Sequence, residues 1–283
     1  MSTKSLLTET PGSELHATWE ALQAGGIGRT HLKKIRSNPD VVEKIAKLLK
    51  VRERRTTYTY PPEYQPSSIA EQIKKLQTIP EFSELDAAWA LNEAQAWYDS
   101  LDLPEWVENP LVKVWDESVG GYHTALGIVL SAIAREREFY NYREGQFTPK
   151  LLRQNEATHE AELKLKSEQP GDFLILPAQM GDRWGGYSVD EVSKSYNEGE
   201  FGVGLLAGAS GVYTQPNRLF RWEQLHMDLP GDEFDDPVAE GRFDHVPYLR
   251  FPGVGVGAGT GSRGDVDAYF GSVSAFVPQY PES

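Results

Sequence analysis

The apolar positions of the first fifty-five residues recur with helical spacing in three short stretches. The first lies between residues 14 and 24, the second follows Thr30, and the third follows Asn38-Pro39, a cap followed by a first-turn proline. The apolar positions are Leu15, Trp19 and Leu22, then Leu32 and Ile35, then Val42, Ile45 and Leu49. This pattern predicts a unit of three short helices over residues 1–55.

Residues 56–68, TTYTYPPEYQPSS, show neither helical nor alternating spacing and hold three prolines and three tyrosines. Prolines favour extended polyproline geometry and remove backbone donors. We therefore predict a Tyr/Pro-rich linker and a domain boundary here. The segment either spaces two parts of the chain or lies as a strap across the larger part.

Helical spacing returns between residues 69 and 168. The apolar positions between Phe82 and Leu101 predict a long amphipathic helix, and the run Tyr122–Tyr140 predicts a helix at the centre of the fold because it is apolar over most of its first four turns. Thr148-Pro149 is typical of the start of a further helix that ends near Ser167.

The pattern changes in residues 169–283. The apolar run 172–178 predicts a buried strand, and the closing run 269–278 predicts a final one. Glycine alternates with small residues over 253–261, which is typical either of a flat strand whose glycine face is pressed by a backbone or a ligand, or of a glycine-rich loop or edge hairpin. The sequence thus predicts an α+β body over 69–283, helical to residue 168 and mixed strand and loop after it.

Composition fits a globular protein, since 39% of the 283 residues are hydrophobic. The absence of cysteine excludes disulfides, thiolate zinc sites and iron–sulfur clusters. No continuous apolar run is long enough to span a bilayer, and the first twenty residues have no apolar signal-peptide region. We therefore expect a cytoplasmic protein that does not use a membrane.

Charge is unevenly distributed. Residues 1–60 hold 11 basic and 6 acidic side chains, a net of +5, whereas the remaining residues hold 17 and 36, a net of −19. The short helices with a basic outer face resemble helix-turn-helix modules, in which cations meet phosphates. The resemblance implies nucleic-acid binding through Lys33, Lys34, Arg36, Lys44, Lys47 and Lys50. Docking to an acidic protein, or mere packing, accounts for the same pattern.

The densest polar cluster lies in RWEQLHMDLPGDEFDD, residues 221–236. On a strand, His226 and Asp228 share a face, and a histidine nitrogen beside carboxylates suits a divalent metal such as iron, manganese or zinc. Asp232 and His245 are the nearest candidates for further ligands. An acidic surface turn at Pro230-Gly231 is the alternative interpretation.

Other motifs indicate no chemistry. Gly202, Gly204 and Gly208 miss the dinucleotide fingerprint by one residue, so we expect them to serve close packing. The order of LILPAQMG, Glu200-Phe201-Gly202, WEQLHMDLPGDEF and GSVSAFVPQ resembles uncharacterised bacterial proteins over residues 172–279, and this resemblance implies no activity, cofactor or catalytic residue.

The sequence favours a non-catalytic binding or adaptor protein whose basic helical unit contacts nucleic acid or an acidic partner. One alternative is a metal-dependent enzyme that uses the His226/Asp228 cluster. Another is a structural or assembly component. The pattern specifies neither a ligand, a reaction nor an oligomeric state.

Overall fold

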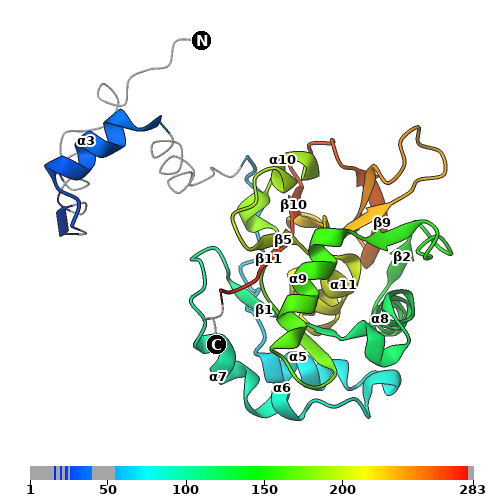
Figure 1. Ribbon diagram of the computed structural model, residues 1–283. Helices are drawn as coiled ribbons and strands as arrows, with labels where there is room; N and C mark the ends of the chain where they lie inside the picture. The colour runs from blue at the N-terminus through cyan, green and yellow to red at the C-terminus, as the bar shows by residue number, and fades with distance from the viewer. Residues whose placement is uncertain (1–15, 17–19, 21–22, 25, 40–54, 280–283) are drawn as a thin grey trace. The chain divides into compact units, whose positions relative to one another are not determined.

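The computed structural model describes residues 16, 20, 23–24, 26–39 and 55–279 (Figure 1). The chain divides into two units, Met1–Glu53 and Arg54–Ser283. In the first unit, helix α3 (Arg29–Ser37) corresponds to the second of the three predicted helices. The predicted third helix, with Lys44, Lys47 and Lys50, lies outside the described residues.

The second unit contains both helices and strands, in agreement with the predicted α+β class. Its helical elements are α5 (Ile69–Leu76), η1 (Pro80–Phe82), α6 (Ala88–Asn92), α7 (Ala94–Asp99), η2 (Asp116–Val119), α8 (Tyr122–Glu136), α9 (Glu156–Ser167), η3 (Asp182–Trp184), α10 (Val189–Ser193), α11 (Leu205–Thr214) and η4 (Pro216–Arg218). Its strands are β1 (Asn109–Val114), β2 (Phe139–Asn141), β3 (Leu152–Gln154), β4 (Phe173–Gln179), β5 (Glu200–Gly202), β6 (His226–Asp228), β7 (Asp232–Phe234), β8 (His245–Arg250), β9 (Val256–Ser262), β10 (Phe270–Ser272) and β11 (Ser274–Phe276).

The strands form two sheets. The first has the order β1-β4-β11-β5 and is antiparallel throughout. The second contains β10-β6-β8-β7-β3, and β9 joins it by pairing with both β8 and β2. Strands β10 and β11 are separated only by Val273 yet belong to different sheets. The closing run of the chain therefore joins the two sheets.

Three strands lie in the part of the chain that was predicted to be helical, namely β1, β2 and β3. The predicted long helix over 82–101 is divided into η1, α6 and α7. The backbone leaves the helical region at Ala87 (φ −116°, ψ 8°), before α6, and at Glu93 (φ −122°, ψ −27°), between α6 and α7. The N-cap of α9 is Asn155, whose side chain accepts a hydrogen bond from the Thr158 amide, and not Thr148. Residues 152–154 pair with β7 instead. Apolar spacing marks buried positions but does not fix backbone continuity.

Residues 56–68 belong to the second unit and pack against the rest of it. Tyr60 Oη accepts hydrogen bonds from the amides of Met180 (2.9 Å) and Asp182 (3.2 Å), and Tyr64 Oη donates to Gln215 Oε1 (3.0 Å). The segment runs across the unit as a strap, the second of the two arrangements considered for it.

Helix α11 is the centre of the second unit, since all ten of its residues are buried. It packs against α8, α5 and β1. Its small residues allow close approach: a Cβ at Gly208 would lie 2.4 Å from Leu229 Cδ2. This packing is the role that was expected for the glycines of this segment.

Both ends of α11 are satisfied by side chains from other elements. At the N-terminus, Asp232 accepts hydrogen bonds from the Leu205 amide (2.6 Å) and the Tyr122 hydroxyl, and Tyr122 Oη accepts from the Leu206 amide (3.1 Å). Such partners are needed because the first amides of a helix have no acceptor within it.

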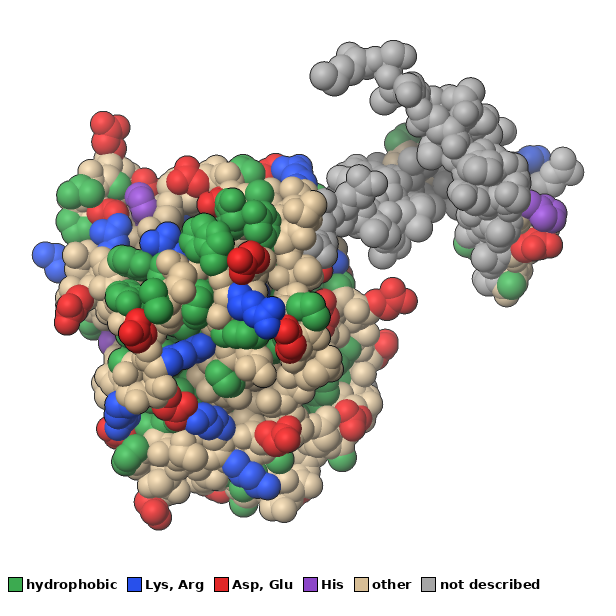
Figure 2. All heavy atoms as spheres, turned by 180° about the vertical axis from the view of Figure 1, so that it is seen from behind, with side chains coloured by type: hydrophobic (Ala, Val, Ile, Leu, Met, Phe, Trp, Pro, Cys, Tyr) green, Lys and Arg blue, Asp and Glu red, His purple; other side chains and the backbone are tan. Residues whose placement is uncertain are grey.

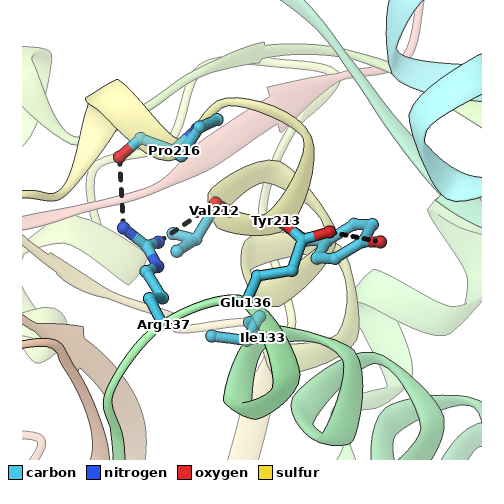
Figure 3. Close-up of a pocket in the computed structure, with 6 residues that line it drawn as sticks. All are labelled: Ile133, Glu136, Arg137, Val212, Tyr213 and Pro216. Carbon is cyan, nitrogen blue, oxygen red and sulfur yellow. Dashed lines mark hydrogen bonds between the residues drawn. The ribbon is translucent and has the colours of Figure 1, made fainter.

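Arg137 supports the C-terminal end of α11. Its guanidinium donates to the carbonyls of Val212 (3.1 Å), Pro216 (3.2 Å) and Leu219 (2.9 Å). Figure 3 shows this guanidinium in a small pocket between α8 and α11. The other charged side chain of the pocket also has partners, since Glu136 accepts hydrogen bonds from Lys75 and from the Tyr213 hydroxyl. We therefore interpret this pocket as an anchor of the helix.

Replacement of Arg137 by leucine should lower the free energy of unfolding by about 2–4 kcal/mol, because it removes charged hydrogen bonds and leaves carbonyl groups without donors. Arg135→Leu is the matched control. This exposed arginine lies in the last turn of α8, two residues before Arg137, and only approaches Glu81 at 4.0 Å. Its replacement should change the free energy of unfolding by less than about 1 kcal/mol. Urea denaturation followed by tryptophan fluorescence measures both. Equal losses would contradict the anchoring role.

Candidate functional site

The two faces of the second sheet differ in character. Met227, Leu249, Val256 and Ala258 point to one side and belong to the main hydrophobic core. The alternate residues of the same strands point to the other side. We call this other side the aromatic face; it consists of His226, Asp228, Tyr248, Arg250, Phe270 and Ser272, with Tyr140, Tyr142, Trp222 and Tyr269 around them.

The register of the strands places the residues of the aromatic face side by side. Asp228 on β6 is opposite Ser272 on β10 and opposite Tyr248 on β8. His226 is likewise opposite Phe270. The face is therefore assembled from strands that are distant in sequence, with Asp228 between a hydroxyl and a tyrosine.

The alternating glycines of β9 make room for tyrosine rings. A Cβ at Gly257 would lie 2.8 Å from Tyr142 Cε2, and one at Gly259 would lie 2.5 Å from Tyr248 Oη. Two rings of the same chain thus press on the glycine positions of this strand. Neither glycine could be replaced without moving a ring of the aromatic face.

The rings form a continuous series. Tyr269 contacts Tyr58 and Trp222, with centroid separations of 4.2 and 5.7 Å. Trp222 lies 5.6 Å from His226, which in turn lies 5.0 Å from Phe270. Phe270 contacts Tyr248 at 5.4 Å. The series stays accessible at Trp222, which is 45% exposed. Tyr142, over Gly257 on the same face, is 46% exposed.

Several polar groups of this face have no hydrogen-bond partner among the described residues. Ser272 Oγ and Arg250 Nε are buried and unpaired, and neither ring nitrogen of His226 makes a hydrogen bond of good geometry. The half-buried Asp228 carboxyl is not among the hydrogen-bonded groups of the described chain. Other buried side chains of the second unit, such as Gln154 and Gln224, also have an unpaired atom; what sets this face apart is that its unpaired groups lie beside exposed aromatic rings.

The same surroundings alter the ionisation of two residues. Burial, reinforced by the nearby charge of Asp267, raises the pKa of Asp228 to about 7. Burial, together with the charges of Arg218 and Arg250, lowers the pKa of His226 to about 4. At neutral pH the imidazole is therefore uncharged, and the carboxyl can both donate and accept a hydrogen bond.

The four residues predicted as metal ligands have different surroundings. His226 and Asp228 share a face, as expected, but Asp232 caps α11 and His245 Nδ1 lies 2.7 Å from Asp244 Oδ1. Across residues 55–279 and the described part of the first unit, no three His, Asp or Glu side chains are grouped so that they could hold a metal ion. The structure does not bring the four together.

Two of the predicted nucleic-acid-binding residues can be placed. Lys33 and Lys34 are exposed on α3, whose first turn has no acidic residue. The side chain of Arg36 and the residues Lys44, Lys47 and Lys50 lie outside the described part.

Sequence reasoning identified His226 and Asp228 but missed Trp222, Tyr248 and Tyr269, which surround them. One signal was present in the sequence: the glycine alternation over 253–261 was typical either of a strand pressed on its glycine face by a backbone or a ligand, or of a glycine-rich loop or edge hairpin. The sequence did not reveal that tyrosine rings of the same chain press on this strand, because the pairing of β8 with β9 is set by the fold.

Comparison with known proteins finds no family model that matches the chain, and no significant match among curated proteins or solved structures. Within the described residues, no helix is both long and apolar enough to cross a bilayer.

Substitutions at Asp228 and His226 should change the pH dependence of stability in opposite directions. The raised pKa of Asp228 means that the folded state binds this proton more tightly, so the contribution of Asp228 to stability falls as pH rises from about 4 to about 7. Relative to the wild type, Asp228→Asn should therefore become more stable as pH increases over this range.

The lowered pKa of His226 has the opposite effect, because the folded state excludes its proton and stability rises with pH between about 4 and 6.5. His226→Gln should therefore lose stability relative to the wild type as pH increases. Urea denaturation at half-unit pH steps measures both trends, and parallel curves for the three proteins would rule out these ionisation shifts.

Proposed function

We propose that this protein is a non-catalytic binding protein that takes a ligand on the aromatic face of its second unit. The observation that carries the proposal is the coincidence of unpaired polar groups with exposed aromatic rings on one side of one sheet. The opposite side of the same strands is filled by the hydrophobic core.

A ligand on this face would gain in two ways. It would hydrogen-bond the partly exposed Asp228 carboxyl, which has no partner among the described residues. Stacking on Trp222 or Tyr142 would remove apolar surface from water. Both gains favour a bound state over the free one.

The surroundings of the other candidate ligands favour binding over metal-dependent catalysis. Asp232 is engaged by the Leu205 amide and the Tyr122 hydroxyl, and His245 lies against Asp244 and, at 3.9 Å, Asp236. A metal site would need these groups to leave partners that support α11 and the end of β8.

A separate observation favours a second function for the first unit. Helix α3, RTHLKKIRS, has four lysine or arginine residues and no acidic one, and Lys33 and Lys34 are exposed. Cationic side chains that contact a nucleic-acid backbone release the counterions of its phosphates. We propose that this helix contacts nucleic acid, while the charge of −19 on residues 61–283 opposes that contact.

Ligand binding on the aromatic face can be tested with a screen of saccharides, nucleosides and proline-rich peptides. A ligand should raise the melting temperature of the full chain. Trp222→Ala should weaken its binding by at least about tenfold, as expected for an exposed aromatic anchor. Trp106→Ala is the matched control, because Trp106 lies against Phe276 and Arg183, away from this face. Failure of all three classes to bind would contradict the proposed function.

Nucleic-acid binding can be tested by fluorescence anisotropy with duplex DNA at two salt concentrations. The full chain with Lys33→Glu and Lys34→Glu should bind at least about tenfold more weakly, with a shallower salt dependence. The control carries Lys150→Glu and Lys194→Glu, two exposed lysines of the second unit, and has the same net charge. Equal losses in both variants would show an effect of net charge and contradict a role for α3.

A further inference from the structure

We infer that the ligand of the aromatic face is a neutral oligosaccharide, an inference that rests on the proposed binding function. The chemistry of the face has three features that together select this class of molecule: exposed aromatic rings, intermixed donors and acceptors, and charges of both signs.

The rings provide the stacking surface. A pyranose ring has an apolar side made of C–H groups, which packs against the flat side of an aromatic ring. Trp222 and Tyr142 are nearly half exposed, and Trp222 continues into the ring series through Tyr269. Because the series runs on from Tyr269 to Tyr58, it is longer than a single ring and suits a ligand of several sugar units.

The polar groups provide the hydrogen bonds. Asp228, with its pKa raised to about 7, accepts hydrogen bonds and in its protonated form also donates one. The partly exposed guanidinium of Arg250 only donates. The hydroxyl of Tyr248, opposite Asp228, does both. Adjacent sugar hydroxyls are themselves donors and acceptors, so they match this mixture without a change of charge.

The charges argue against ionic ligands. Asp267 is close enough to Asp228 to raise its pKa, so a phosphate placed on the face would meet two carboxyl groups. Arg250 is close enough to His226 to lower its pKa, so a cationic peptide would meet a guanidinium. On the side of the second unit that Figure 2 shows, basic and acidic side chains are interspersed and neither sign forms a continuous patch.

The test uses the full chain and isothermal titration with neutral hexasaccharides of glucose, N-acetylglucosamine, xylose, mannose and galactose. We expect at least one of them to bind, and Trp222→Ala and Tyr142→Ala to weaken its binding by at least tenfold each. Asp228→Leu should weaken it by a similar factor, whereas Asp228→Asn, which keeps a donor and an acceptor, should weaken it less. Trp106→Ala should leave the affinity unchanged.

The outcomes separate the two proposals. If a nucleoside or a proline-rich peptide binds in a manner that depends on Trp222 while no saccharide does, the saccharide inference is overturned and the binding function stands. If nothing binds, both are overturned. If a saccharide binds equally well to all variants that keep the wild-type circular dichroism spectrum, the aromatic face is not its site and the inference fails.

Discussion

The arrangement of the second unit depends on the burial of helix α11. A helix whose ten residues are all buried cannot leave its terminal amides and carbonyls to water, so other elements must supply partners. Asp232 on β7 and Tyr122 on α8 serve the N-terminal end, and Arg137, directly after α8, serves the C-terminal end. These contacts tie α8 to both ends of α11 and bring the second sheet to one of them. An unmet group at either end would cost about 1–3 kcal/mol.

The position of α11 also explains the two characters of the second sheet. Its core side packs with the helices through residues such as Met227 and Leu249. The alternate residues then lie on the aromatic face. An outer sheet face is commonly polar and hydrated, whereas this one combines aromatic rings with Asp228 and Arg250.

Two aspartates of the second sheet, on strands β6 and β7, show how similar chemistry acquires different roles. Burial raises the pKa of both Asp228 and Asp232 to about 7. Asp232 accepts hydrogen bonds from the Leu205 amide and the Tyr122 hydroxyl and so supports the fold. Asp228 has neighbours in Ser272 and Tyr248 but no hydrogen bond from either. We therefore assign stability to the first and ligand binding to the second, a distinction that the pKa values alone do not make.

The sequence by itself determined the elements whose pattern is local and strong. The buried strand β4, the helix α8 and the mixed α+β class follow from apolar runs and spacing, although α11 and not α8 lies at the centre, and strand parity alone puts His226 and Asp228 on one face. Tertiary structure decided the rest. The division of the 82–101 helix, strands β1 to β3 in the middle region, and the capping role of Asp232 depend on partners far away in the chain. The aromatic face likewise exists only once β8 pairs with β6 and β9, because strand pairing between distant segments is set by the packing of the whole unit and not by any local pattern.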